Sequence, residues 1–305
     1  MTTRLDDSLN TLENHKLLGA ADIRKIASTA GVSPTKKFGQ NFVIDPGTVR
    51  KIARIAQVSA EDYVIEVGPG LGSLTLAILE TGANVQAIEI DPTLAQQLPQ
   101  TIETYMPEAL NRFRVLTKDA LEVTPADIPH SQDHQQIHLI ANLPYNVATP
   151  IIITLLERFA NLASFVVMVQ KEVADRLCAT PGSKIYGVPS IKLAWFGISE
   201  KAVTIGRNVF WPAPNVDSAL VKFEKQPNAW CNNEHAPNRE TTFELIDAAF
   251  RQRRKTLHAA LKNQVPEEAY DISGINPTRR GETLTIDEFT KLALAVEKIQ
   301  NHDEK

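Results

Sequence analysis

Residues 64–75 read VIEVGPGLGSLT, a short apolar run that passes through glycines at 68, 70 and 72 into sequence compatible with a helix. Four further short runs, rich in β-branched residues and each followed by helix-compatible sequence, repeat this pattern, as buried parallel strands do. The five predicted strands are 63–67, 85–90, 114–117, 137–141 and 165–169. The alternation predicts an α/β fold built on a doubly wound, mostly parallel, Rossmann-like sheet.

The pattern changes after residue 200. The segments KAVTIG (201–206) and DSALVKFE (217–224) are two strands close together in the chain, which predicts an antiparallel hairpin at one edge of the sheet. The polar segment 224–240 contains Pro227 and Pro237, and we interpret it as a linker to a second domain.

Helical patterns at 241–262 and 286–299 predict that this second domain is a smaller C-terminal helical domain. One amphipathic helix, 20–30, precedes the sheet. The expected divisions are an N-terminal extension at 1–35, the sheet domain at 36–228 and the helical domain at 238–305.

Composition narrows the class of protein. The formal net charge is -4 and the pI is near 6.0, so nucleic-acid binding would need locally concentrated positive charge. The two cysteines, Cys178 and Cys231, are far apart and form no CxxC pair, which suits a reducing compartment better than a disulfide or zinc framework. The amino terminus carries acids, and apolar runs are short, so we expect a cytoplasmic protein with no signal peptide or membrane span.

The glycine loop indicates the class of cofactor. Its spacing is G-x-G-x-G, whereas the loop that seats a dinucleotide pyrophosphate is G-x-G-x-x-G, so the pattern favours S-adenosyl-L-methionine, which has no phosphate. Glu89 ends the next predicted strand, where a carboxylate can accept hydrogen bonds from both hydroxyls of a ribose. Asp119 follows the third strand and could accept from the exocyclic amine of the cofactor's adenine.

The fourth strand ends in the cluster NLPY, residues 142–145. The carboxyl ends of parallel strands face the ligand crevice, so this cluster is predicted beside the cofactor. The amino nitrogen of an adenine is a poor nucleophile, and it reacts better when acceptors hold its hydrogens and let it pyramidalise. The Asn142 side-chain oxygen and the Leu143 carbonyl supply two acceptors, Pro144 fixes the chain direction, and Tyr145 offers a flat face for the base.

Positive charge is concentrated in two stretches. The segment RQRRKTLHAALK (251–262) holds five basic residues and no acid, and Leu257 and Leu261 keep one helical face apolar. The second set is Lys36, Lys37, Arg50, Lys51 and Arg54. Contact with RNA phosphates is the favoured interpretation of both, and a solvated helix face is the alternative. His130, His134 and His138 recur at every fourth residue, but the third enters a strand, so a metal site is not expected.

Eight segments, in order between about residue 36 and residue 261, together resemble the small-subunit (16S) ribosomal RNA adenine N6,N6-dimethyltransferase family. They are KKFGQNFV, EVGPGLGSLT, EID, KDAL, NLPYNVATP, QKEVADRL, FWPAPNVDSALV and FRQRRKTL. The resemblance implies an enzyme that dimethylates N6 of two adjacent adenosines in a hairpin loop near the 3′ end of 16S rRNA in the 30S particle. It also implies a role in small-subunit biogenesis and an RNA-binding C-terminal domain.

By resemblance, the cofactor contacts are Asn41, Val43, Gly68, Glu89, Asp119 and Asn142, and the target-base pocket is formed by Asn142, Tyr145 and Phe210. The family usually has leucine where this chain has Val43. Both residues are apolar, and the contact is expected to be made largely by the main chain, so we expect binding to be kept. Tyr145 and Phe210 are expected to grip an adenine taken out of its stack.

The alternatives differ in substrate or in class. The related 23S rRNA adenine methyltransferases perform the same chemistry at another site. A ribosome-assembly or transcription factor could keep the fold without the chemistry, although the intact Asn142, Pro144 and Tyr145 argue against this. An NAD oxidoreductase is the third candidate. The favoured reading is a monomeric, metal-free methyltransferase that acts on RNA.

Overall fold

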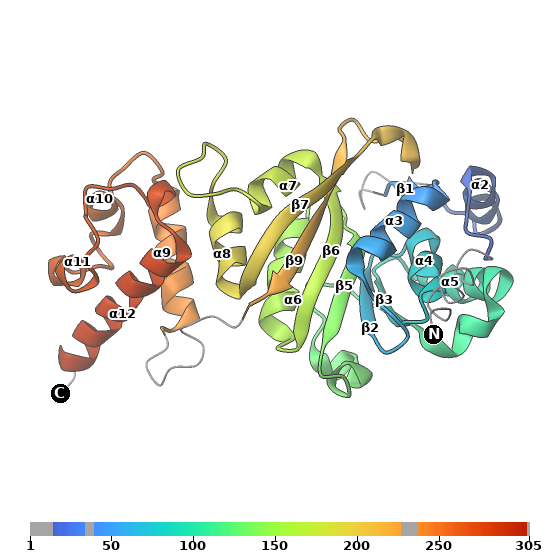
Figure 1. The fold of residues 1–305 in the computed structure, drawn as a ribbon, viewed down its shortest axis with the longest axis horizontal. Coiled ribbons are helices and arrows are strands. Elements are labelled where there is room, and N and C mark those ends of the chain that lie inside the picture. The colour runs from blue at the N-terminus through green and yellow to red at the C-terminus, as the bar shows by residue number, and fades with distance from the viewer. Residues whose placement is uncertain (1–14, 34–39, 227–236, 304–305) are drawn as a thin grey trace, which may run out of the picture. The chain divides into compact units, whose positions relative to one another are not determined.

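The computed structural model describes residues 15–33, 40–226 and 237–303 (Figure 1). Contacts divide the chain into two compact units. The first unit comprises residues 1–174 and 200–224, and the second comprises 175–199 and 225–305. By their contacts, residues 175–199 therefore belong to the second unit, together with residues 225–305. The sequence pattern had not predicted this assignment. The domain limits 1–35, 36–228 and 238–305 stay a prediction.

A seven-stranded sheet forms the centre of the first unit, in the order β4-β3-β2-β5-β6-β9-β7. The strands are β2 (Tyr63–Val67), β3 (Asn84–Glu89), β4 (Phe113–Thr117), β5 (Ile137–Asn142), β6 (Leu162–Gln170), β7 (Gly197–Ile205) and β9 (Ser218–Lys225). The pairs among β4, β3, β2, β5 and β6 are parallel, and β9 pairs with β6 in antiparallel register. The predicted Rossmann-like sheet with an antiparallel edge is confirmed.

The strand order places the ligand crevice. The chain runs from β2 outward to β4, then returns to β5 on the other side of β2 and continues outward to β6. Because such crossovers are right-handed, the helices of the two halves cover opposite faces of the sheet. The direction of winding reverses between β2 and β5, and ligands of open α/β sheets bind at the carboxyl ends of the strands at this reversal.

The edge hairpin carries an insertion. Between β7 and β9 the chain forms β8 (Phe210–Trp211), which leaves the main sheet and pairs antiparallel with β1 (Phe42–Val43). In this small pair Phe42 lies opposite Trp211, and Val43 lies opposite Phe210. The pairing of β1 with β8 therefore connects the segment just before helix α3 (Pro46–Ala56) to the proline-containing loop 210–217.

Helices pack around the sheet of the first unit (Figure 1): α2 (Ala20–Thr29), α3 (Pro46–Ala56), α4 (Ser73–Glu80), α5 (Pro92–Tyr105) and α6 (Ala148–Arg158). The predicted helix 20–30 is confirmed as α2. Its Ile23 and Ala27 are buried in the same hydrophobic core as Val49 and Ile52 of α3. The described part of the N-terminal extension is therefore an integral layer of this unit.

The second unit is helical and contains α8 (Val188–Phe196), α9 (Arg239–Arg251), α10 (Leu257–Leu261), α11 (Glu267–Ser273) and α12 (Ile286–Asp303); α7 (Lys171–Leu177) spans the division between the units. The predicted helix 286–299 is confirmed within α12. The predicted continuous helix 241–262 is wrong, because the chain turns at residues 252–255.

Tertiary hydrogen bonds explain this break. The Leu257 amide donates to the Arg279 carbonyl at 2.7 Å, and the His258 amide donates to the Pro277 carbonyl at 3.1 Å, so neither amide is available for a bond to the preceding turn. The Thr256 side chain then caps the new helix. Asp247 stands four residues before Arg251, but no acid stands four residues from Arg253, Arg254 or Lys255 to support a continuous helix.

Candidate functional site

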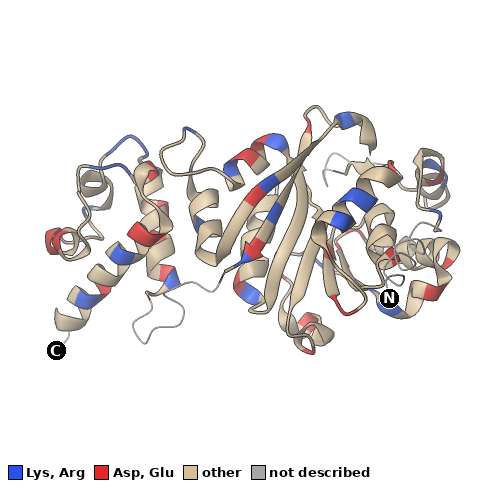
Figure 2. Cartoon of the chain, viewed as in Figure 1, with Lys and Arg blue, Asp and Glu red and all other residues tan. Residues whose placement is uncertain are grey.

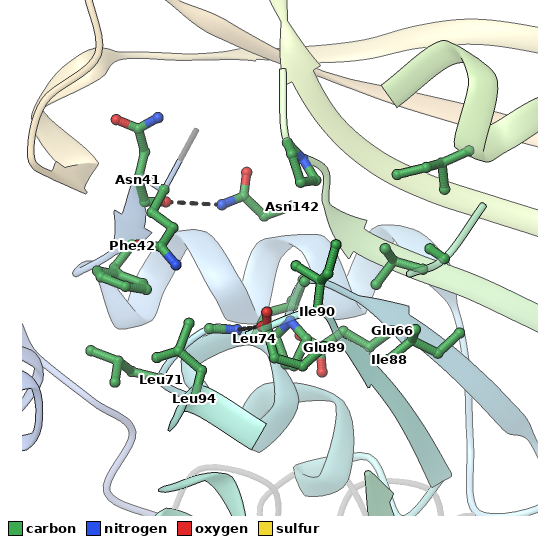
Figure 3. Close-up of a pocket in the computed structure, with 18 of the residues that line it drawn as sticks. Asn41, Phe42, Glu66, Leu71, Leu74, Ile88, Glu89, Ile90, Leu94 and Asn142 are labelled. Carbon is green, nitrogen blue, oxygen red and sulfur yellow. Dashed lines mark hydrogen bonds between the residues drawn. The ribbon is translucent and has the colours of Figure 1, made fainter. Parts of the chain in front are cut away.

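A cavity of about 900 Å³, including its open mouth, lies at the carboxyl ends of β2, β3, β4 and β5 (Figure 3). This volume suits a small-molecule ligand. The structure brings to its wall seven of the residues selected from sequence: Asn41, Val43, Gly68, Glu89, Asp119, Asn142 and Pro144. Apolar side chains supply most of the remaining wall, among them Phe42, Leu71, Ile88, Ile90 and Leu94.

The glycine loop has the backbone that only glycine adopts without strain. The φ angles are +68° at Gly68, +60° at Gly70 and +97° at Gly72. A Cβ at Gly70 would lie 2.9 Å from the ring of Phe42, so the space that this glycine leaves is filled by a side chain of the protein rather than by a ligand. A Cβ at Gly68 would lie 3.7 Å from Pro144 Cδ and 3.8 Å from the Asn142 carbonyl oxygen, so the glycine loop and the NLPY segment lie next to each other at this point.

Glu89 ends β3 inside the cavity and is only 4% exposed. One carboxylate oxygen accepts from the Gly70 amide at 3.2 Å, and the other accepts from the Asp91 amide at 3.0 Å. Burial raises the pKa of Glu89, and these backbone bonds lower it in part. Each oxygen has further lone pairs, so the carboxylate can hold the loop and still accept from a vicinal diol.

Glu66 also lines the cavity, and sequence reasoning missed it. It lies on β2, is 1% exposed, and its Oε2 atom has no hydrogen-bond partner among the described residues. Burial raises the pKa of Glu66 to about 8. The signal that could have revealed this residue is a charged side chain within the otherwise apolar strand VIEV.

Asp119 lines the cavity and follows β4. Its Oδ1 accepts from the Leu121 amide at 2.9 Å, which holds the carboxylate in a local turn. Ile90, which directly follows Glu89 in the chain, also lines the cavity and is 47% exposed. It was not among the site residues predicted from the sequence. An exposed branched apolar residue directly after a predicted ligand acid is the signal for it.

Asn142 is oriented by a bond across the cavity mouth. Its side-chain nitrogen donates to the Asn41 carbonyl at 3.1 Å, as the dashed line in Figure 3 shows. The nitrogen is thus committed to the protein, and the side-chain oxygen is left to accept from a ligand. The next residue is also fixed, because the Leu143 amide donates to the Met168 carbonyl of β6 at 3.0 Å.

Tyr145 and Phe210 do not line the described cavity. Tyr145 is half-buried, and its hydroxyl lies 2.8 Å from Ser218 Oγ. Phe210 is 3% exposed and packs in the hydrophobic core opposite Val43. The predicted gripping of a base by these two rings stays a prediction, and Phe210 is buried by core packing in this structure.

The two basic stretches prove to be different. Lys36 and Lys37 lie outside the described residues. Arg50 forms a two-bond ion pair with Glu80, at 2.9 and 2.8 Å, and also donates to the His15 carbonyl, so it is a structural residue and its assignment to an RNA-binding patch is not supported. Lys51 and Arg54 are exposed on α3.

The exposed basic residues of the stretch 251–262 lie in and beside the turn between α9 and α10, where Figure 2 shows basic residues in blue: Arg251, Arg253, Arg254, Lys255 and Lys262. Arg253 pairs with Glu282 at 2.6 Å and donates to the Lys184 carbonyl at 2.6 Å. Arg253 therefore stabilises the turn, whereas the neighbouring Arg254 and Lys255 are exposed to solvent.

The described ranges contain neither a candidate metal-binding cluster nor a helix suited to span a membrane. No group of three or more His, Cys, Asp or Glu side chains there is arranged to hold a metal ion. His138 instead contacts Ser164 at 2.8 Å and Asp62 at 3.3 Å. None of the helices within those ranges has the length and apolar character that a membrane crossing requires.

The chain is similar to known proteins over most of its length. Residues 32–298 match the family model described as ribosomal RNA adenine dimethylase. The chain is 66% identical over 295 residues to "Ribosomal RNA small subunit methyltransferase A" of Bifidobacterium longum subsp. infantis, covering 94% of this chain and 96% of that protein. It is 50% identical over 292 residues to the protein of the same name from Streptomyces griseus, covering 93% and 97%.

Solved structures show the same fold. A dimethyladenosine transferase from Plasmodium falciparum is 25% identical and superposes with a TM-score of 0.69, covering 84% of this chain and 98% of that one. The 23S rRNA methyltransferase ErmE, 21% identical, superposes with a TM-score of 0.62, covering 84% and 100%, and shows the fold alone. The family model matches residues 32–298, and the match to the Bifidobacterium relative covers 96% of that protein. The chain therefore belongs to the ribosomal RNA adenine dimethylase family.

Proposed function

We propose that this chain dimethylates N6 of two adjacent adenosines in a hairpin loop near the 3′ end of 16S rRNA, in the 30S particle, using S-adenosyl-L-methionine. Family membership supports the reaction, and the small-subunit name shared by the relatives supports the substrate. The observation that carries the proposal is the Asn142 side chain, whose nitrogen is bound to Asn41 and whose oxygen remains to accept from an adenine amine.

The cavity suits the proposed cofactor. Glu89 would accept from the two ribose hydroxyls, and Asp119 would accept from the adenine amine. Ile90 offers an apolar surface to the adenine ring. The partnerless oxygen of Glu66 fits an N–H donor such as the ammonium group of the methionine end. When bound, S-adenosyl-L-methionine supplies a methyl group activated by a positively charged sulfur.

Asn142, at the end of β5, and Leu143, just after it, would prepare the adenine amine to accept a methyl group. The Asn142 oxygen and the Leu143 carbonyl would accept from the two hydrogens of the adenine amine. Held in this way, the nitrogen turns its lone pair out of conjugation with the ring, which is the state needed for transfer. The bond that the Asn142 side-chain nitrogen donates to the Asn41 carbonyl, and the bond that the Leu143 amide donates to the Met168 carbonyl, fix both acceptors before the substrate arrives. Fixed dipoles of this kind stabilise a transition state without reorganisation.

The remaining parts of the proposal concern partners. We propose that the exposed basic residues of the α9–α10 turn contact rRNA phosphates. The enzyme would act as a cytoplasmic monomer, without a metal, in the biogenesis of the small subunit. Tyr145 would support the target base once the base has left its stack.

Replacing Asn142 by alanine tests the proposed role of its oxygen. We expect the turnover number on 30S particles to fall by about 10²- to 10³-fold, the usual effect of losing one hydrogen bond formed in the transition state, while RNA affinity changes little. Asn146, exposed in the same segment, provides the matched control, and Asn146→Ala should keep most activity. Near-normal turnover of Asn142→Ala at saturating cofactor and RNA would refute the mechanism.

A further inference from the structure

Ser218 lies behind the proposed target-base region and is the first residue of β9. It is 0% exposed, and its hydroxyl lies 2.8 Å from the hydroxyl of Tyr145. The two residues are separated by 73 positions in the chain. A buried hydroxyl pair of this length is a full hydrogen bond between side chains, whichever oxygen donates.

The backbone around Ser218 holds its hydroxyl in a fixed place. Ser218 pairs with Gln170 in the antiparallel β6–β9 ladder, and β6 pairs in parallel with β5, the strand that leads to NLPY. One residue earlier, the Asp217 carbonyl accepts from the Lys171 amide at 2.9 Å. The Tyr145 hydroxyl is therefore bound to the same sheet that carries Asn142, but from the far side of β6.

A tyrosine ring turns about two side-chain bonds. The hydroxyl oxygen lies on the axis of the second rotation, so a hydrogen bond at this oxygen limits the first rotation and fixes where the far end of the ring lies. Without such a bond, a half-buried ring beside an open site can occupy several orientations. Methyl transfer is sensitive to such freedom, because a displacement of about 1 Å in a reacting group can reduce the rate about a hundredfold. The hydrogen bond that fixes the Tyr145 ring can therefore control how the target base is aligned.

We propose that Ser218 is a positioning residue for methyl transfer: its buried hydroxyl fixes the Tyr145 ring and thereby aligns the target adenine with Asn142. The proposal rests on the proposed function. Ser218 touches neither the cofactor cavity nor the reacting atoms, and it acts only through Tyr145.

The second methylation of each adenosine should depend most on this alignment. The first transfer forms a bond from the amine nitrogen to the methyl carbon as the bond from that carbon to the cofactor sulfur breaks, which leaves a neutral thioether, and one amine proton passes to water. The amine then carries one methyl group and one hydrogen, so only one rotamer about the bond from carbon 6 to the amine leaves room for a second methyl. A loosely held ring would allow the base to sit in the unproductive rotamer. Loss of the Ser218 hydroxyl should therefore raise the ratio of monomethylated to dimethylated adenosine, in addition to lowering the rate.

The test uses the full-length protein with 30S particles and S-adenosyl-L-methionine, and it compares Ser218→Ala, Tyr145→Phe and the double variant. For each single variant we expect kcat to fall about tenfold or more. We also expect the monomethyl fraction to rise, while KM for the particle and cofactor affinity stay near wild type. The double variant should be no worse than either single variant, because both substitutions remove the same bond.

Ser164→Ala is the matched control, because Ser164 on β6 also bonds a side chain, His138 Nδ1 at 2.8 Å, but near the other end of the strands. It should leave the product ratio unchanged. A wild-type product ratio and kcat in Ser218→Ala, or fully multiplicative losses in the double variant, would overturn the proposal. If Ser218→Ala fails to fold, Tyr145→Phe removes the bond from the other side, and its product ratio decides. A wild-type enzyme inactive on 30S would instead contradict the proposed function.

Discussion

Glu66 shows how a single buried carboxyl makes the folded state sensitive to pH. Burial raises its pKa from the usual 4.5 to about 8, so between these values the folded chain keeps a proton that the unfolded chain has lost. The folded state then binds more protons than the unfolded state, and the free energy of unfolding must decrease as pH rises through this range. The stabilising contribution is complete below the lower value and is lost by about pH 8.

Substitution of Glu66 by glutamine removes this titration. We expect the melting temperature of the cofactor-free wild type to fall, relative to that of Glu66→Gln, between about pH 5 and pH 8. Differential scanning fluorimetry across a pH series measures the difference. Two curves that stay parallel over the whole range would show that Glu66 does not titrate there.

Glu89 has a double role at the residue scale, because it bonds the Gly70 and Asp91 amides and would also bind the cofactor. Glu89→Ala should weaken S-adenosyl-L-methionine binding by about 1.5 to 3 kcal/mol for each charge-assisted hydrogen bond lost. Glu89→Gln, which keeps one carbonyl oxygen, should lie between the alanine variant and wild type. Calorimetric affinities equal to wild type would reduce Glu89 to a residue that only braces the loop.

At the scale of elements, α2 belongs to the core of the first unit. Ile23 is fully buried, and Tyr105 of α5 donates its hydroxyl to Asp22 of α2 at 2.9 Å. Ile23→Ala should lower the free energy of unfolding by about 2 to 5 kcal/mol, the usual cost of emptying a buried aliphatic site. Lys25→Ala, exposed on the same helix, is the control. Equal urea midpoints for the two variants would show that α2 packs loosely.

The turn between α9 and α10 presents Arg251, Arg254 and Lys255 to solvent. If each neutralises one phosphate, replacing all three by alanine should reduce the log-log slope of 30S affinity against salt by about 2 to 3. The control replaces three exposed lysines elsewhere, Lys25, Lys291 and Lys298. Binding measured across a salt series distinguishes the cases, and lines of equal slope for wild type and the triple variant would identify the turn as an ordinary solvated surface.

The turn between α9 and α10 also shows where apolar periodicity fails to predict the limits of a helix. All five parallel strands were predicted to within three residues at each end, because each is a short run of apolar and β-branched residues whose limits are local. Four of the runs are largely buried, whereas β4 lies at the sheet edge and buries only Phe113. The helix 241–262 was predicted as continuous, because its apolar spacing is helical on both sides of the break. The bonds that break it come from Pro277 and Arg279, and local sequence carries no sign of such partners.

At the scale of the whole molecule, the site residues predicted from motifs and those found only in the structure differ in kind. Glu89, Asp119 and Asn142 each end or follow a strand of the main sheet, so their meeting at one edge follows from the strand order. Asn41 instead precedes β1, and only the resemblance to the family pointed to it. The pairing of Tyr145 with Ser218 and that of Arg50 with Glu80 depend on side-chain directions across distant segments. Such pairs are properties of packing, which no single stretch of sequence contains.

The central claim concerns the reaction and its place on the ribosome. The most direct measurement is mass spectrometry of adenosines in 16S rRNA, after 30S particles that lack these methyl groups have been incubated with the protein and S-adenosyl-L-methionine, with 23S rRNA incubated in parallel. The account predicts N6,N6-dimethyladenosine at two adjacent positions in the hairpin loop near the 3′ end of 16S rRNA, and unmodified 23S rRNA. Methylation of 23S rRNA alone, or of neither RNA, would contradict it.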